Sequence, residues 1–222
     1  MKKRMLLIVT LTLFILAVFA FAESDKQIID DYTLSEGWNL AYGLNDPQQI
    51  ISAGSNYASP PSVEEIRNSI RLIYAYDGAI EEYVLLYAKD GMLETGEYEN
   101  FNPPVSISED IPTSSVWVLA ETGHSIMYEA EVYPLLSERN IKKGWNFVPI
   151  SSEIKENSIN DFKGDCNIQS LYTYAENDGI TQWLDLKEIY AFDDANAFTD
   201  SSASELQLVI KVENDCQMGA SN

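Results

Sequence analysis

The sequence predicts a mainly β fold with short helices, built as two tandem similar units of about five strands each, barrel-like or sandwich-like. Three observations lead to this prediction. Short segments alternate apolar and polar residues, turn residues separate them, and the motif order of residues 28–133 recurs in residues 135–219. Although the net charge is -21, 45% of the 222 residues are hydrophobic, which is enough apolar surface for the chain to fold.

A Gly-Trp-Asn triplet opens each unit, at residues 37–39 and 144–146. Bulky and smaller residues alternate after the triplet, which predicts a strand entered from a turn. Later in each unit a serine precedes an acidic residue by three positions, at residues 62–65 and 158–161. This spacing is typical of a capping box and predicts a short helix after each serine.

Tyrosine pairs follow the helices, Tyr74 with Tyr76 and Tyr172 with Tyr174. Residues two apart on a strand lie on one face, so both rings of a pair are expected on the same side. Asp and Gly residues follow each pair and predict a hairpin. The simplest interpretation is that these aromatic residues lie in the cores of their units. The residues that mark the repeat and its core are Trp38, Asn39, Tyr74, Tyr76, Trp117, Trp145, Asn146, Tyr172 and Tyr174.

The closing strands of the first unit are predicted at residues 116–119 and 126–128, with His124 in a hairpin turn between them. Their counterparts in the second unit are residues 208–212 and 217–218, and residues 133–134 form the predicted joint between units. A single turn histidine without a nearby partner is typical of a solvated side chain, not of a catalytic or metal-binding group.

The N-terminus predicts export. Three basic residues at positions 2–4 precede an uncharged run at 5–22, and small residues close the run at Ala20 and Ala22. This is the pattern of a signal peptide (residues 1–22) cleaved after Ala22. The alternative is an uncleaved anchor, because the run approaches the ~20 residues that span a bilayer. In both cases the rest of the chain is expected outside the cytoplasm, secreted or at the cell surface.

The two cysteines, Cys166 and Cys216, both lie in the second unit. An even cysteine count in an exported chain favours a disulfide, because thiols are not kept reduced outside the cytoplasm. Two buried free thiols are the alternative.

Charge and composition exclude several function classes. The 35 acidic residues against 14 basic ones disfavour binding to nucleic acid or to an anionic membrane surface. One histidine and two cysteines leave almost nothing for zinc sites or histidine-dependent triads. Calcium is the candidate cofactor, since clustered carboxylates suit it, but no loop matches an EF-hand and the metal ligands stay unassigned. A solvated anionic surface is the alternative.

The order of Gly37-Trp38-Asn39-Leu40, capped turn, tyrosine hairpin and Trp117-Val118 resembles β-rich tandem modules of exported archaeal and bacterial surface proteins, which open with "GWNLI" and close with "GYWV". The second copy keeps Gly144-Trp145-Asn146 but has Val209-Ile210 at its close. The resemblance implies surface assembly, adhesion or ligand presentation and not catalysis.

The sequence therefore predicts an exported, non-enzymatic cell-surface or extracellular protein with a structural, adhesion or interaction role. Its expected partner is a protein or glycan of the cell envelope or the extracellular space. A pair of carbohydrate-binding modules is the alternative and requires a row of exposed aromatic rings. A glycoside hydrolase is a further alternative and requires two carboxyl groups ~5 to 9.5 Å apart in a cleft.

Overall fold

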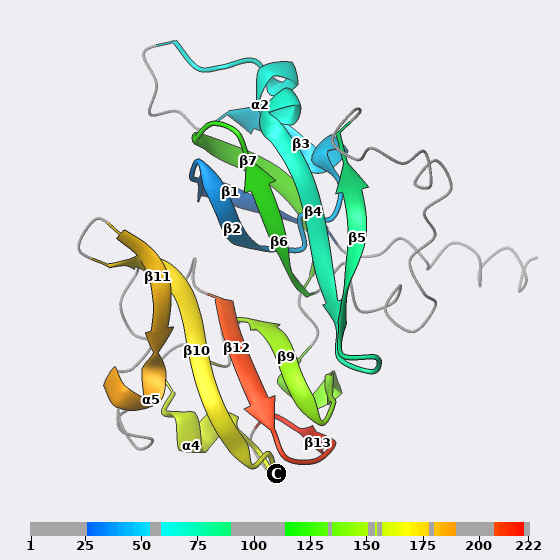
Figure 1. Ribbon diagram of the computed structural model, residues 1–222, viewed down its shortest axis with the longest axis vertical. Coiled ribbons are helices and arrows are strands. Elements are labelled where there is room, and N and C mark those ends of the chain that lie inside the picture. Colours follow the sequence, from blue (N-terminus) through cyan, green and yellow to red (C-terminus); the bar gives the residue numbers. More distant parts are fainter. Residues whose placement is uncertain are drawn as a thin grey trace, which may run out of the picture.

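The computed structural model is mainly antiparallel β-structure with a few short helices, which confirms the predicted fold class (Figure 1). It describes residues 26–53, 59–89, 114–132, 135–150, 154, 157–177, 180–189 and 207–219. The predicted signal peptide at residues 1–22 and the predicted joint at residues 133–134 lie outside this part of the chain. No helix of the described residues is long and apolar enough to cross a membrane.

The first unit packs a four-stranded sheet, in the order β2-β6-β4-β5, against a three-stranded sheet, in the order β1-β7-β3. Its core lies between the two sheets and under the helix α2. The elements are β1 (Lys26–Leu34), β2 (Gly37–Tyr42), η1 (Pro47–Gln49), β3 (Ile50–Ala53), α2 (Val63–Ser69), β4 (Ile70–Asp77), β5 (Glu82–Ala88), β6 (Ser115–Ala120) and β7 (His124–Glu131).

The second unit has a four-stranded sheet in the order β11-β10-β12-β9 and a two-stranded sheet of β13 and β8. A separate core lies beneath it. The elements are η4 (Leu136–Glu138), β8 (Asn140–Ile141), β9 (Gly144–Pro149), α4 (Ile159–Phe162), β10 (Ile168–Asn177), β11 (Ile180–Asp185), α5 (Leu186–Ile189), β12 (Gln207–Val212) and β13 (Cys216–Gln217).

The two four-stranded sheets have the same strand order, since β2-β6-β4-β5 corresponds to β9-β12-β10-β11. The flanking pairs, β1 with β7 and β8 with β13, also occupy matching places in the chain. The paired residues correspond position by position: Trp38–Leu119 matches Trp145–Lys211, Tyr74–Trp117 matches Tyr172–Val209, and Tyr76–Tyr83 matches Tyr174–Trp183.

Two expectations about the strands need correction. The described residues form seven strands in the first unit and six in the second, more than the expected five or so, because β1, β3 and β8 have weak sequence patterns. In addition, β6 and β7 do not pair as a hairpin around His124. The chain turns a corner there and passes from one sheet of the unit to the other.

The asparagine of each Gly-Trp-Asn triplet closes the turn that precedes it. The Oδ1 atom of Asn39 accepts from the Ser35 amide (2.8 Å), and its Nδ2 donates to the carbonyls of Ser35 (2.8 Å) and Gly37 (3.0 Å). Asn146 makes the corresponding bonds: its Oδ1 accepts from the Lys142 amide (2.9 Å), and its Nδ2 donates to the carbonyls of Lys142 (2.7 Å) and Gly144 (3.2 Å). The glycines of the two triplets have φ of +96° and +95°, a left-handed conformation that glycine adopts without steric cost.

The two short helices begin at the predicted capping boxes. Ser62 and Glu65 bond to each other's backbone amides at the start of α2, at 3.2 and 2.6 Å. Ser158 and Asp161 do the same at α4, at 3.3 and 3.0 Å. Each box satisfies amide hydrogens that would otherwise lack a partner at a helix start.

Candidate functional site: an aromatic cleft between the two units

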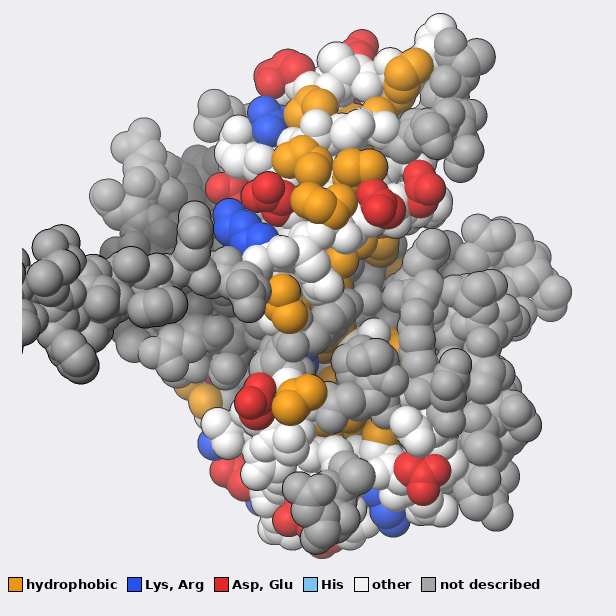
Figure 2. All heavy atoms as spheres, turned by 180° about the vertical axis from the view of Figure 1, so that it is seen from behind, with side chains coloured by type: hydrophobic (Ala, Val, Ile, Leu, Met, Phe, Trp, Pro, Cys, Tyr) orange, Lys and Arg blue, Asp and Glu red, His pale blue; other side chains and the backbone are white. Residues whose placement is uncertain are grey.

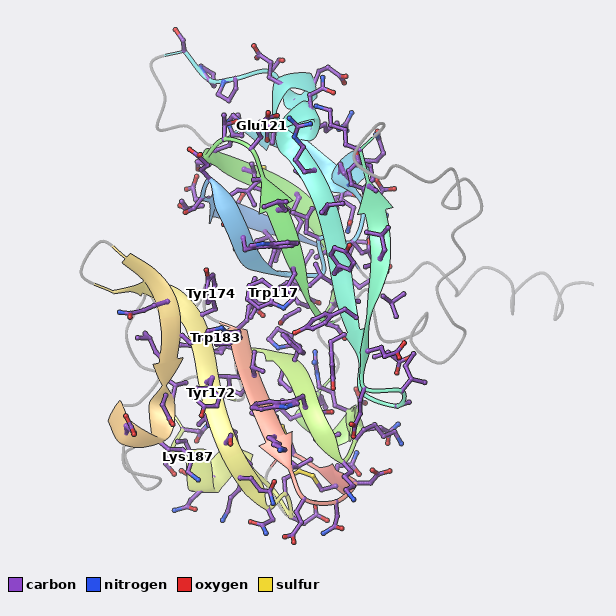
Figure 3. All side chains as sticks on the ribbon, viewed as in Figure 1. Trp117, Glu121, Tyr172, Tyr174, Trp183 and Lys187 are labelled. Carbon is purple, nitrogen blue, oxygen red and sulfur yellow. A yellow bond between two sulfur atoms is a disulfide. The ribbon has the colours of Figure 1, made fainter. Side chains whose placement is uncertain are left out.

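Each four-stranded sheet packs one face on its own core and presents the other face to the opposite unit. Strand β6 shows how: Val116, Val118 and Ala120 are buried in the first core, so Trp117 between them must point the other way. The view with side chains shows Trp117, Tyr174 and Trp183 in the space between the two sheets (Figure 3).

This placement corrects the expectation that the aromatic markers of the repeat form the cores. Both core clusters are mainly aliphatic, and their aromatic members are Tyr32, Tyr42, Tyr128 and Phe162. Strand alternation shows which residues share a face but not which face of the sheet meets the core, so the size of the rings alone does not place them there. The markers that instead lie on the outer faces are Trp38, Tyr74, Tyr76, Trp117, Trp145, Tyr172 and Tyr174.

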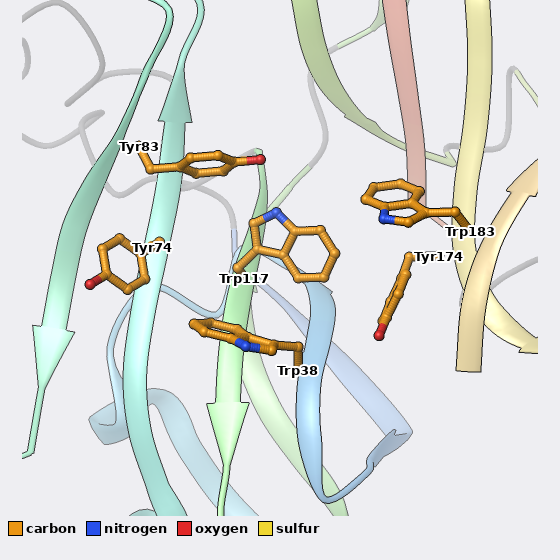
Figure 4. A pocket seen from close by; sticks show the side chains of 6 residues that line it. All are labelled: Trp38, Tyr74, Tyr83, Trp117, Tyr174 and Trp183. Carbon is orange, nitrogen blue, oxygen red and sulfur yellow. The ribbon is translucent and has the colours of Figure 1, made fainter. Parts of the chain in front are cut away.

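The first pocket of the cleft has a volume of about 570 Å³, and every described residue that lines it is aromatic. Four of these side chains come from the first unit and two from the second, so neither unit forms the pocket alone (Figure 4). The lining residues are Trp38, Tyr74, Tyr83, Trp117, Tyr174 and Trp183.

The second pocket has a volume of about 410 Å³ and shares Tyr83 and Trp183 with the first, so the two pockets are parts of one cleft. Both volumes fall within the range of ~300 to 1,000 Å³ that is usual for ligand sites. Its lining residues are Tyr76, Tyr83, Trp145, Phe147, Tyr172, Trp183 and Val209.

The rings of the cleft meet at steep angles and do not form one flat surface. Trp117 lies at the centre, with its ring centroid 5.1 Å from that of Tyr174 and 5.6 Å from that of Trp183, at interplanar angles of 71° and 74°. Trp38 meets the Trp117 ring at 89°. Edge-to-face contact places the positive ring edge against a negative ring face, which holds the cluster together and leaves other faces turned to the cleft.

The two pockets are related by the correspondence between the units. Replacing each residue of the first pocket by its counterpart in the other unit yields Trp145, Tyr172, Trp183, Val209, Tyr76 and Tyr83, all of which line the second pocket. The contacts across the cleft follow the same rule, because β6 touches β9 and β12 touches β2. At the centre, the Ser115 hydroxyl donates to Oε1 of its own counterpart, Gln207, at 2.5 Å.

Three large rings of the cleft are substantially exposed: Trp38 by 40%, Trp183 by 48% and Tyr83 by 54%. Burial, and then the nearby charge of Glu81, raise the pKa of Tyr76, so its phenol is neutral at neutral pH. The described residues that line the two pockets include no acidic side chain. A mechanism based on paired carboxylates therefore gains no support from this cleft.

The remaining predicted site residues lie away from the cleft. Cys166 and Cys216 are at bonding distance, with their sulfurs 2.14 Å apart, as expected for the predicted disulfide. Together with Asp165 they are the one group of potential metal ligands among the described residues, but sulfurs bonded to each other offer no thiolate to a metal.

His124 is half-buried at the start of β7, where its Nε2 lies 2.9 Å from the Thr122 hydroxyl. Burial lowers its pKa, and the nearby Glu65 carboxylate partly opposes this shift. Two acidic residues near the C-terminus are held by groups of the chain: Asp215 accepts a hydrogen bond from the Lys143 backbone amide at 2.8 Å, and Glu213 accepts one from the Asn167 side chain at 2.6 Å. The hydrogen bond from the Lys143 backbone amide lowers the pKa of Asp215. Calcium binding stays a prediction.

Comparison with known proteins found no matching family model, no matching curated protein and no matching solved structure. The functional argument therefore rests on the residues of the chain and their arrangement.

Proposed function

We propose that the protein is an exported, non-enzymatic binding protein made of two copies of one β unit, and that the aromatic cleft between the copies recognises its ligand. It works in the cell envelope or outside the cell. The observation that carries the proposal is the composition of the first pocket, whose described lining residues are six aromatic side chains drawn from both units. Exposed rings gathered in a concavity are typical of a binding site, because covering them removes apolar surface from water.

Export is supported by two features. The basic and apolar N-terminal pattern has the form of a signal peptide, and the disulfide suits an oxidising compartment. Cell fractionation followed by N-terminal sequencing tests this part. We expect a mature chain that begins at Glu23, whereas an intact N-terminus in the membrane fraction would identify an anchor. A full-length chain in the cytoplasm would refute export.

Ligand binding can be followed by intrinsic fluorescence. All four tryptophans of the chain, Trp38, Trp117, Trp145 and Trp183, line the cleft, so a change in emission reports on the cleft itself. The mature protein should be titrated with panels of oligosaccharides, organic cations and peptides. We expect a saturable change that Trp117→Ala abolishes.

The matched control for Trp117→Ala is Ile28→Ala. Ile28 is 46% exposed on β1, a strand of the three-stranded sheet and not of the cleft. The view from behind shows hydrophobic side chains on the surface of the first unit with acidic ones around them (Figure 2). Loss of an exposed apolar side chain outside the cleft tests for non-specific adsorption. A ligand response that Ile28→Ala removes and Trp117→Ala leaves intact would contradict the assignment of the cleft.

A carbohydrate-binding role is the second candidate, and the exposure of Trp38, Tyr83 and Trp183 favours it. Sugar rings stack on exposed aromatic faces. Because the rings meet at steep angles, the cleft suits a single soluble chain better than the flat surface of an insoluble polysaccharide. Titration with soluble oligosaccharides, alongside co-sedimentation with insoluble polysaccharides, tests this candidate. Binding only to the insoluble form would contradict the cleft geometry.

A further inference from the structure

The two units differ at the position opposite the tryptophan of the Gly-Trp-Asn triplet, a ring that lines the corresponding pocket of each. In the second unit this position is Lys211, whose Nζ lies 5.6 Å from the centre of the Trp145 ring. In the first unit the same position, opposite Trp38, is Leu119. An ammonium group at this distance from an indole face is attracted by the negative face of the ring. The ring of Trp145, which lines the second pocket, thus already has a cation supplied by the chain beside it, whereas the ring of Trp38, which lines the first pocket, has the apolar Leu119 opposite it.

We propose that the first pocket binds the quaternary ammonium group of a small organic cation, an inference that rests on the proposed role of the cleft in ligand binding. Six rings of described residues line this pocket. Those of Trp38, Trp117, Tyr174 and Trp183 meet one another at angles of 64° to 89°. Faces turned in several directions can surround a compact cation, and their attractions add.

The described lining of the first pocket includes no acidic side chain, which favours a quaternary nitrogen. A primary ammonium would have to give up hydrogen bonds to water, and the described lining offers no carboxylate to replace them. A quaternary ammonium has no N–H group, so it leaves no donor without a partner. The chain's net charge of -21 raises the local concentration of any cation near the cleft.

The test uses tetramethylammonium and choline as probes, and as the control for charge the neutral alcohol in which carbon replaces the choline nitrogen. Trp38 and Trp117 line only the first pocket and Trp145 only the second, so their indole N–H signals in the mature protein, assigned with single Trp→Phe variants, report binding at each pocket separately. We expect the Trp38 signal to shift saturably and the Trp145 signal much less. Choline should bind about tenfold more tightly than the neutral alcohol, and ethanolamine more weakly than choline.

Two exchanges between the units sharpen the test. Leu119→Lys places opposite Trp38 the side chain that Trp145 already has beside its ring, and should abolish the shift of the Trp38 signal. Lys211→Leu removes the cation from Trp145 and should make that signal respond to choline, so that the stoichiometry rises from one to two. Melting temperature and the unperturbed indole spectrum verify that each variant is folded.

Equal binding of choline and the neutral alcohol would overturn the inference and leave the binding role of the cleft intact. A response to oligosaccharides but not to cations would also overturn the inference, while supporting a binding role of the cleft and favouring a glycan as its ligand. If no probe of any class perturbs the indole signals, both the inference and the proposed function fail. Retention of choline binding by a folded Leu119→Lys variant would also refute the assignment of the pocket.

Discussion

A single side chain, the asparagine of the Gly-Trp-Asn triplet, sets the turn from which the first strand of each four-stranded sheet begins. Asn39 and Asn146 each use one oxygen and one nitrogen to satisfy backbone groups that point into the turn. Asn39 is also buried, with 7% of its surface exposed, so water cannot replace the lost bonds easily. The residue therefore contributes to stability through hydrogen bonds and not through apolar burial.

Replacing Asn39 with Ala should lower the free energy of unfolding by about 1 to 3 kcal/mol, because partly buried backbone groups of Ser35 and Gly37 lose their partner. Asn146→Ala should cost less, since Asn146 is more exposed and water can take over. Urea unfolding of both variants measures the difference. Equal or negligible losses would show that the turn keeps its conformation without the side chain.

At the scale of elements, α2 and α4 are too short to be stable alone and depend on their caps. Hydrogen bonds from the Ser62 backbone amide and then from its hydroxyl lower the pKa of Glu65 below 4.5. The Ser158 hydroxyl and then its amide lower the pKa of Asp161 below 3.8. Both caps thus require the ionised carboxylate.

Because these two pKa values are lower in the folded protein than in the unfolded chain, the caps stabilise the fold above the ordinary values of 4.5 and 3.8. This stabilisation is lost as the pH falls through the lowered values. The double variant Ser62→Ala/Ser158→Ala should be less stable than the wild type at about pH 7, with the difference shrinking towards about pH 2. Urea unfolding across this range checks it. A constant difference would contradict the cap mechanism.

The disulfide is the second element-scale feature, because it ties the segment after α4 to β13 across 50 residues of sequence. Closing a loop of that length restricts the unfolded chain and is worth about 4 kcal/mol. Reduction should therefore destabilise the second unit. The first unit contains no cysteine and should change only through its contacts with the second.

Hydrogen exchange with and without reductant resolves the two units. We expect reduction to increase the exchange rates of amides in β12 and β13 more than those in β4 and β6. A double Cys→Ser variant, Cys166→Ser/Cys216→Ser, serves as the control for side reactions of the reductant. Unchanged exchange throughout the second unit would show that the crosslink adds nothing to its stability.

At the scale of the whole molecule, two separate cores are joined by an interface of matching surfaces. Near its centre Ser115, 1% exposed, bonds to Gln207, 3% exposed. A buried amide oxygen that loses its donor costs about 1 to 3 kcal/mol. This bond and the aromatic contacts couple the unfolding of one unit to the other.

Ser115→Ala should weaken that coupling, so that calorimetry shows two partly separated transitions where the wild type shows one. Ser69→Ala is the matched control, because the Ser69 hydroxyl also is buried but bonds within the first unit, to Ile66 at 2.7 Å. That variant should lower stability without separating the transitions. If both variants unfold in one step, the aromatic contacts suffice for coupling.

Much of the local structure followed from residue patterns. The capping serines, the tyrosine hairpins and the cysteine pair lie at the positions that the sequence predicts, because each depends on residues close in sequence or on simple pairing. The separation of β6 and β7 into different sheets was missed, since strand patterns carry no information about which strand each one pairs with.

The cleft was also missed, although all its residues stood in the repeated motifs. Trp38 and Trp145 were expected in cores because a large ring is most simply buried in its own unit. One sequence feature indicates the other arrangement. Aliphatic residues such as Val116 and Val118 alternate with the rings along the strand, and they can fill a core without them. That feature indicates an outer aromatic face but not what it meets.

The sequence by itself determined the β class, the positions of the helix starts and hairpins, the disulfide pair and the recurrence of motifs, because these depend on local hydrogen bonding and on residue spacing. Only the tertiary structure decided that the aromatic faces turn away from the two cores and meet each other. That outcome depends on how two folded sheets pack, and packing between distant surfaces leaves no periodic trace in the chain.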